Sequence, residues 1–160
     1  MTVRTESGLT LAELADRWQD AVGGVFATVD HRVDESVLRS YADLFGYTSP
    51  RFSSAEAARG EGFRGLVAPA GYAAVYTHEA VLVALHDPDL GVPFAWNLHA
   101  GQSLDFAEPV CAGDVLRTTV TLSGVVQRPP NLFYSFTTET RNAEGTLCAS
   151  GVSTQVVRFL

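Results

Sequence analysis

The side chains best suited to acid–base chemistry gather around His99, which begins a stretch reading HAGQ. A neutral imidazole accepts a proton near neutral pH, and its other nitrogen donates a hydrogen bond. Asn97 and Gln102 lie close by in the sequence and carry amide donors. These three residues are therefore candidates for a base and its hydrogen-bonding neighbours. The alternative is that His99 stands at a strand end and bonds only to backbone.

Arginine is the second candidate group, because all 11 basic residues of the chain are arginines. Arg51, Arg59 and Arg64 lie close together in the sequence. A guanidinium group binds phosphate through two parallel hydrogen bonds, so the cluster predicts a phosphate contact. Three solvated surface charges are the alternative. The lack of lysine excludes Schiff-base chemistry, apart from the N-terminus.

Small residues form the third candidate group, at the start of a long apolar stretch. Ala68, Ala70 and Gly71 leave the backbone there uncovered. If a helix starts at this point, its free N–H groups can hold a developing oxyanion. Pro69 has no N–H group, so only its neighbours can serve as donors.

Other classes of function find no support in the sequence. No His, Cys, Asp or Glu cluster has metal-ligand spacing, and neither a glycine-rich nucleotide loop nor a nucleophile elbow is present. We therefore expect no metal or organic cofactor. The net charge of -7 argues against general nucleic-acid binding. Without a visible signal peptide or membrane span, we expect a cytoplasmic protein, with Cys111 and Cys148 as buried reduced thiols, although a disulfide is possible.

The positioning elements begin with residues 68–85, in which only Glu79 is formally charged. A helix that is apolar nearly all round is either buried or spans a membrane. This stretch is too short and too interrupted for a span, so it predicts a core helix with Pro69 in its first turn. His78 and Glu79 should point in different directions from that helix, as polar residues of the core or of an interface.

Three further helices are predicted, over 10–22, over about 35–45, and over a short stretch that Ser53 caps and that ends at Arg59. Thr10 and Glu13 can form a capping box, and Asp34 caps the second helix. The rest of the chain is rich in strand-forming residues. Strands are predicted over 25–29, 94–97, 99–106, 114–127, 132–141 and 146–159, with a hairpin turn at 142–145.

This order of elements predicts one domain of the α+β class, because helices come first and strands follow. The simplest arrangement is a curled antiparallel sheet around one long central helix, which is the hotdog fold. The helix over 10–22 is then an addition to that single domain of residues 1–160. His31 and His86 fall in predicted loops.

Three segments resemble the MaoC-like dehydratase family of hotdog proteins, and especially its non-catalytic or N-terminal branch: SYADLFG (40–46), GFRGLVAPAGYA (62–73) and HAGQSLDFAEPVCAGDVLRTTVTL (99–122). The last is the most specific, because Glu108-Pro109 and Gly113-Asp114 occur at the family's spacing. The resemblance implies dimeric pairing and acyl thioesters of coenzyme A or acyl carrier protein as ligands. Family enzymes interconvert (R)-3-hydroxyacyl and trans-2-enoyl thioesters.

The chain departs from this family at the catalytic loop. Active members carry a motif close to G-D-x-N-P-x-H after the second helix, whose Asp and His act on water. Residues 46–52 read GYTSPRF, so Tyr47, Ser49 and Phe52 stand in place of the Asp, Asn and His. Phenylalanine cannot transfer a proton, and a tyrosine with an ordinary pKa is a poor base at neutral pH.

The resemblance also implies roles for the candidate residues. Tyr47 and Ser49 would hydrogen-bond the thioester or a hydroxyl group, unless the loop is a relic without chemistry. Arg51 and Arg64 would meet the pyrophosphate of coenzyme A or the phosphopantetheine of a carrier protein. The acyl chain and its carbonyl oxygen would lie near the start of the core helix and the HAGQ strand, beside Ala68, Ala70, Gly71, Asn97, His99 and Gln102.

Three hypotheses of function remain open from the sequence. The chain is the acyl-binding subunit of a dehydratase or hydratase, active beside a catalytic hotdog partner. Alternatively, it is a homodimeric enzyme with a rebuilt site that uses Tyr47, His99 or Asn97, for dehydration, thioester hydrolysis or cyclisation. The third hypothesis is an acyl-thioester binder without catalysis. Dimerisation is expected in any case, because a lone hotdog domain leaves a sheet edge and an apolar helix flank exposed.

Overall fold

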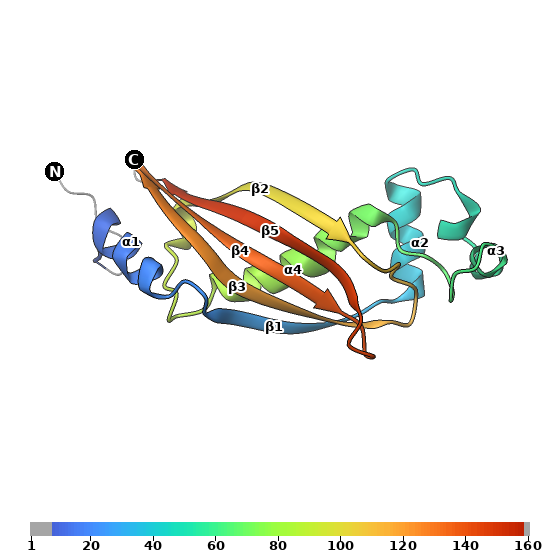
Figure 1. Ribbon diagram of the computed structural model, residues 1–160. Coiled ribbons are helices and arrows are strands. Elements are labelled where there is room, and N and C mark those ends of the chain that lie inside the picture. Colours follow the sequence, from blue (N-terminus) through green and yellow to red (C-terminus); the bar gives the residue numbers. More distant parts are fainter. Residues whose placement is uncertain (1–7, 159–160) are drawn as a thin grey trace.

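The computed structural model describes residues 8–158, in which one helix lies along a curved sheet (Figure 1). In chain order the helices and strands are α1 (Leu11–Asp20), β1 (Val25–Arg32), α2 (Glu35–Leu44), α3 (Ala55–Gly60), α4 (Ala73–Leu85), β2 (Asn97–Phe106), β3 (Val115–Arg128), β4 (Asn131–Arg141) and β5 (Leu147–Arg158). Short 3-10 turns occur at Pro50–Phe52, Ala70–Tyr72 and Phe94–Trp96.

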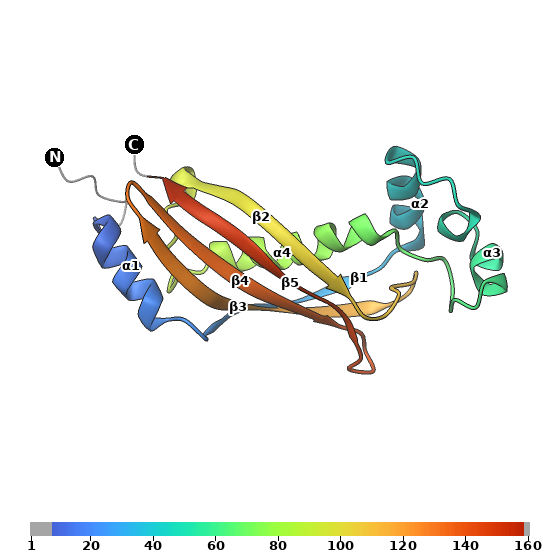
Figure 2. The ribbon, with the colours of Figure 1, turned by 45° about the horizontal axis from the view of Figure 1, so that its top comes forward.

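The sheet has the strand order β1-β3-β4-β5-β2, and every neighbouring pair is antiparallel. Helix α4 runs along its concave face and packs on β1, β3 and β4 (Figures 1 and 2). Helix α1 lies at one end of this layer, and α2 and α3 lie at the other end (Figure 2). The predicted α+β hotdog architecture is confirmed. Strands β1 and β2 are the two edges of the sheet.

Capping residues set the ends of the outer helices as predicted. Thr10 and Glu13 form a reciprocal capping box at the start of α1. The Asp34 carboxylate accepts hydrogen bonds from the backbone N–H groups of Ser36 and Val37 at the start of α2. The cap of α3 is Ser54, so the predicted cap at Ser53 is wrong by one residue.

Two strand predictions are wrong at their boundaries. Residues 94–97 were predicted to be extended, but Phe94–Trp96 form a 3-10 turn after Pro93, and β2 begins at Asn97. Strand β1 continues beyond Val29 to Arg32 because it pairs with β3 along this length. His31 therefore lies in a strand and not in a loop.

The central helix differs from its prediction at its start and on one flank. Pro69 does not lie in the first turn of the α-helix. It is followed by the 3-10 turn Ala70–Tyr72, and α4 begins only at Ala73. The side facing the sheet is buried, but the opposite flank exposes 39% of Val75 and 50% of Val83. The sheet covers only one side of the helix, so an apolar flank stays open in the single chain.

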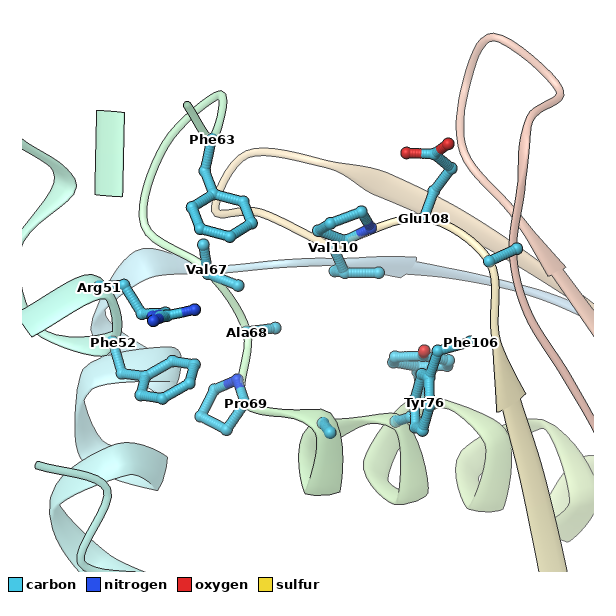
Figure 3. A pocket seen from close by; sticks show the side chains of 14 residues that line it. Arg51, Phe52, Phe63, Val67, Ala68, Pro69, Tyr76, Phe106, Glu108 and Val110 are labelled. Atoms are coloured by element: carbon cyan, nitrogen blue, oxygen red, sulfur yellow. The ribbon is translucent and has the colours of Figure 1, made fainter. Parts of the chain in front are cut away.

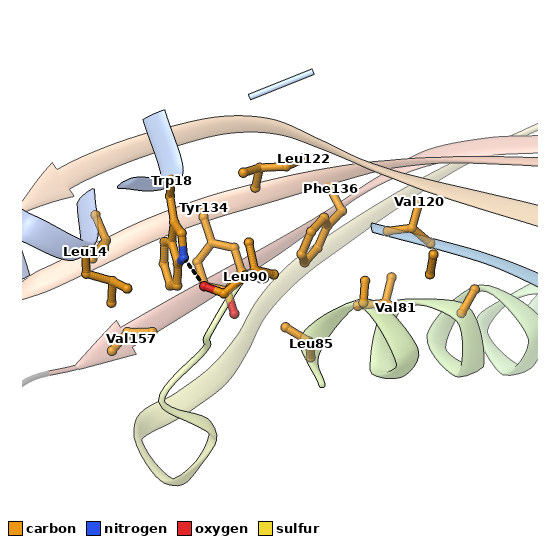
Figure 4. Packing of buried hydrophobic residues seen from close by; sticks show 14 of the residues in the cluster. Leu14, Trp18, Val81, Leu85, Leu90, Val120, Leu122, Tyr134, Phe136 and Val157 are labelled. Carbon is orange, nitrogen blue, oxygen red and sulfur yellow. Dashed lines mark hydrogen bonds between the residues drawn. The ribbon is translucent and has the colours of Figure 1, made fainter. Parts of the chain in front are cut away.

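The end of the sheet near α1 is closely packed (Figure 4). The Trp18 indole N–H donates to the Leu90 carbonyl oxygen over 2.7 Å. The ring centroids of Trp18 and Tyr134 are 4.4 Å apart. Val81 and Leu85 from the second half of α4 complete this core with Phe136. Burial of these side chains holds the last turns of α4 against the sheet.

Two further properties bear on the class of protein. Within residues 8–158, no helix has both the length and the apolar character that a bilayer crossing demands. Cys111 and Cys148 are both buried free thiols.

Candidate functional site

An apolar cavity of about 320 Å³ lies at the start of α4, at the opposite end from Trp18. Figure 3 shows aromatic rings on two of its sides, with Phe52 and Phe63 facing Phe106 and Tyr76. The remaining lining residues are Arg51, Val67, Ala68, Pro69, Ala70, Ala73, Ala107, Glu108, Pro109 and Val110. The cavity can therefore take a hydrocarbon chain.

Two connections that run side by side build this cavity. The segment between α3 and α4 pairs with the segment between β2 and β3, through an isolated bridge between Val67 and Cys111. The Ala68 N–H donates to the Val110 carbonyl oxygen over 2.8 Å, which continues this pairing. Ala73, in the first turn of α4, has too small a side chain to fill the space that these segments enclose.

Few titratable side chains reach this cavity. Burial raises the pKa of Tyr76, so its hydroxyl stays protonated at neutral pH. Figure 3 shows the Glu108 carboxylate on the rim, turned away from the space. Arg51 is the third titratable residue of the lining. A hydrocarbon therefore meets a largely apolar lining, in which Arg51 is the one cation and the Glu108 carboxylate lies on the rim.

Two of the three arginines predicted to bind phosphate already have partners. Arg51 lies 3.0 Å from the Glu61 carboxylate and donates to the Ser49 hydroxyl. Arg64 holds Asp114 through two hydrogen bonds of 2.7 and 2.9 Å, and this pairing raises the pKa of its guanidinium. Arg59 is exposed. A phosphate group would have to compete with carboxylates for Arg51 and Arg64.

Tyr47 lies beside the cavity without lining it. Its ring packs edge-on against Phe52 with the centroids 5.4 Å apart, and it stacks beside Tyr41. Its hydroxyl reaches the backbone of Gly71, just before α4. Tyr47 and the predicted residues Ala68, Ala70 and Gly71 thus lie in one region, as the sequence suggested.

His99 and Gln102 lie in a different place, on the exposed flank of α4. They line a second, open hollow of about 720 Å³ together with Tyr41, Phe45, Ala74, Val75, His78, Glu79 and Leu82. The His99 ring is 6.2 Å from that of His78, and the Gln102 amide donates to the Thr77 hydroxyl. The structure therefore does not bring His99 into the lining of the apolar cavity.

Asn97 lies at the packed end of the sheet. Its side-chain oxygen Oδ1 accepts a 2.7 Å hydrogen bond from the Tyr134 hydroxyl, and its side-chain amide N–H donates to the side-chain oxygen of Gln155. These bonds satisfy a buried phenol and a buried amide. The structure places Asn97, partly buried, at the packed end of the sheet and not beside the cavity.

The sequence did not indicate the roles of His31, Phe63 and Phe106. His31 connects the Glu79 carboxylate, 2.7 Å away, to the Tyr72 hydroxyl, 2.9 Å away. These two hydrogen bonds connect β1 to Glu79 within α4 and to Tyr72 just before it. Phe63 and Phe106 were missed as cavity walls although both lie within the segments quoted for the family resemblance. The sequence does not reveal that the loop with Phe63 and the end of β2 with Phe106 face each other across one space.

The comparisons with known proteins agree with this geometry. A family model described as the FAS1-like dehydratase domain region matches residues 20–150. A UPF0336 protein of Clavibacter michiganensis is 30% identical over 132 residues, covering 82% of this chain and 89% of that protein.

Two solved structures have the same fold. The C-terminally truncated HadBC (3R-hydroxyacyl-ACP dehydratase) complex from Mycobacterium tuberculosis matches with a TM-score of 0.76 and 24% identity, covering 86% of this chain and 97% of that chain. A MaoC-like dehydratase from Rhodospirillum rubrum matches with a TM-score of 0.71 and 26% identity, covering 89% and 96%.

Proposed function

Since the chain belongs to the MaoC-like dehydratase family of hotdog proteins, we propose that it binds an acyl thioester as the non-catalytic subunit of a dehydratase or hydratase. The observation that carries the proposal is the apolar cavity at the start of α4. An acyl chain buried there gains about 0.8 kcal/mol for each methylene group. The thioester belongs to coenzyme A or to an acyl carrier protein, and its head group lies at the charged rim.

The chemistry of the cavity supports a binding role over a catalytic one. Tyr47 and Phe52 stand where the family carries its Asp and His. General acid–base catalysis contributes about 10²–10⁴-fold to a rate, and neither of these side chains supplies it at neutral pH. A partner chain with an intact Asp and His would supply both groups.

A surface for that partner is available next to the cavity. Among residues 8–158, edge strand β2 has no neighbour on its outer side, and it exposes 57% of Leu98 and 55% of Phe106. The apolar flank of α4 lies beside it, with Val75 and the second hollow. Long exposed edges and apolar patches are normally covered. We assign this surface to a second hotdog chain, as in a heterodimer.

A homodimeric enzyme with a rebuilt site is the second candidate. The observation that favours it is the hollow that holds His99, His78 and Gln102, because it lies on the surface assigned to dimerisation. His99 would then act as the base for dehydration, thioester hydrolysis or cyclisation. The two candidates differ in one measurable respect: the proposed subunit needs a catalytic partner for turnover, and the homodimeric enzyme does not.

Reconstitution tests the proposal. The purified chain is assayed for hydration of crotonyl-coenzyme A alone and after mixing with the hotdog chain that co-purifies with it from its host. We expect saturable binding and negligible loss of enoyl absorbance alone, and turnover in the complex. Turnover by the chain alone at ordinary enzyme rates, abolished by His99→Ala, would establish the homodimeric enzyme instead. If the chain binds the thioester but no complex turns it over, the chain is a non-enzymatic acyl-thioester binder.

A further inference from the structure

Two tyrosine hydroxyls converge on one point at the start of α4. A Cβ atom placed on Gly71 would lie 2.8 Å from the Tyr41 hydroxyl oxygen and 3.1 Å from that of Tyr47. Tyr41 comes from α2 and Tyr47 from the loop after it. Their rings are nearly parallel, with an interplanar angle of 25° and centroids 6.3 Å apart. Glycine at position 71 leaves the room that both hydroxyls use.

These two hydroxyls differ from those of Tyr72 and Tyr134. Tyr72 bonds to His31 and Tyr134 bonds to Asn97. Among the hydrogen bonds of residues 8–158, none involves the hydroxyl of Tyr41 or of Tyr47. Both side chains are partly exposed, so a ligand can reach them. The pair therefore offers two donors that no hydrogen bond within residues 8–158 uses.

The protonation state of the pair suits donation. Burial, and to a smaller extent the neighbouring Tyr47, raises the pKa of the Tyr41 hydroxyl. A raised pKa keeps the phenol neutral and able to donate throughout the physiological range. Arg51, a nearby cation of the loop, is already paired with Glu61. A neutral pair of donors fits a carbonyl oxygen better than a phosphate.

The position of the pair fits the polar end of a ligand whose chain fills the cavity. The Tyr47 ring contacts Phe52, which lines the cavity, and Tyr41 lines the hollow on the flank of α4. The hydroxyls thus lie between the buried cavity and the surface assigned to a partner. Because both hydroxyl oxygens lie close to the same point beside Gly71, they stand within about 6 Å of each other. O–H···O bonds span up to about 3 Å, so an acceptor on the side away from the Gly71 backbone can bond to both hydroxyls.

We propose that Tyr41 and Tyr47 together bind the carbonyl oxygen of the thioester, each donating one hydrogen bond to it. This inference rests on the proposed acyl-thioester binding and adds the residues that recognise the carbonyl group. The pair replaces the lost acid–base residues with a site that orients and polarises the thioester. Preorganised donors of this kind also stabilise an enolate-like oxygen as charge develops on it.

Two ligands that differ only in the carbonyl group test the inference. The probes are butyryl-coenzyme A and its S-butyl thioether, in which a CH₂ group replaces the carbonyl. A neutral hydrogen bond contributes about 5-fold to affinity, so the parent should prefer butyryl-coenzyme A by roughly 10-fold or more. Tyr41→Phe and Tyr47→Phe should each weaken butyryl-coenzyme A binding by about 5-fold and leave thioether binding unchanged. The double variant should show no preference.

A matched control and a spectroscopic readout separate recognition from structure. Tyr72→Phe removes a hydroxyl from the same aromatic cluster, but that hydroxyl faces His31, so the preference for butyryl-coenzyme A should persist. The infrared stretch of a ¹³C-labelled thioester carbonyl should lie at lower frequency in the parent than in the double variant. Thermal unfolding verifies that each variant is folded.

The outcomes distinguish this inference from the proposed function. Equal affinity of the parent for both probes, or a preference that survives in the double variant, would overturn the tyrosine site and leave acyl binding intact. If the parent binds neither probe, acyl-thioester binding itself is contradicted, and the tyrosine site with it.

Discussion

The two ends of helix α4 stand in different surroundings, although the sequence is mostly apolar toward both ends. At its C-terminal end, Ala84 and Leu85 pack into a closed core with Trp18 and Phe136. At its N-terminal end, Ala73 faces a cavity of about 320 Å³. The same residue type, alanine, fills a packed site at one end and leaves an open space at the other.

The difference shows where stability and function reside in this fold. Helix α1 closes one end of the sheet, where its Trp18 packs on Tyr134 of β4 and bonds to Leu90 in the segment after α4. Helices α2 and α3 lie at the other end, and the segments that follow them carry two of the aromatic walls of the cavity, Phe52 and Phe63. A change in the closed end should therefore affect folding, and a change in the open end should affect ligand binding.

The largest effect is expected from Trp18→Ala at the closed end. The substitution leaves a cavity and removes the hydrogen bond to the Leu90 carbonyl oxygen, so the free energy of unfolding should fall by about 3–5 kcal/mol. Urea denaturation measures this change. The folded fraction should still bind butyryl-coenzyme A as the parent does. A loss below about 1 kcal/mol, or a specific loss of binding, would break the comparison.

A pair of identical substitutions on α4 sharpens the comparison. Ala84→Leu adds atoms to a packed core and should cost about 1–3 kcal/mol of stability, with ligand binding preserved. Ala73→Leu should cost little stability, because its new atoms enter the cavity. It should weaken binding of a long acyl-coenzyme A by roughly 10–50-fold, since it takes the space of about three carbons worth 0.8 kcal/mol each.

Denaturation and calorimetric titration of the two variants provide the check. Both alanines are buried in the same helix, with 3% of Ala73 and none of Ala84 exposed, so burial alone predicts equal effects. The account is wrong if Ala73→Leu unfolds the chain as much as Ala84→Leu while binding stays intact.

A smaller, pH-dependent effect is expected at the cap of α2, the helix that carries Tyr41. Hydrogen bonds from the side chain and backbone of Ser36 lower the pKa of the Asp34 carboxyl group. Because the folded-state pKa lies below the unfolded value, the cap stabilises the fold above the unfolded pKa. This contribution disappears as the pH falls through the folded pKa, below the ordinary value of 3.8.

Acid denaturation of Asp34→Asn checks this effect. Asparagine is also a good cap but does not titrate, so the stability difference between parent and variant should change only at acid pH, in favour of the variant. A difference that is constant from neutral to acid pH would show that the Asp34 charge plays no part in the cap.

The sequence was sufficient for the fold because its signals are local. The apolar stretch 68–85, the strand-rich second half and the caps at Thr10 and Asp34 each depend on neighbouring residues. Boundaries failed where tertiary pairing overrides local preference, as in the extension of β1 through His31 by pairing with β3.

The site was harder to predict because it depends on how the strands lie along α4. Strand β2 has an irregular register between His99 and Gly101, and the sequence does not reveal this shift. Asn97 lies partly buried at the packed end of the sheet and His99 lies on the helix flank, both away from the cavity. The start of α4 could be singled out because its small residues are visible directly in the sequence, and the structure has an apolar cavity beside it.

The central claim is that the acyl chain occupies the cavity at the open end, and photolabelling tests it most directly. An acyl-coenzyme A with a diazirine at the end of its chain is bound, irradiated and mapped by mass spectrometry. We predict labels on the peptides that contain Val67, Ala73 and Val110, competed by unlabelled ligand and lost in Ala73→Leu. Labels confined to the flank around His78 and His99, or to the packed end around Trp18, would contradict the account.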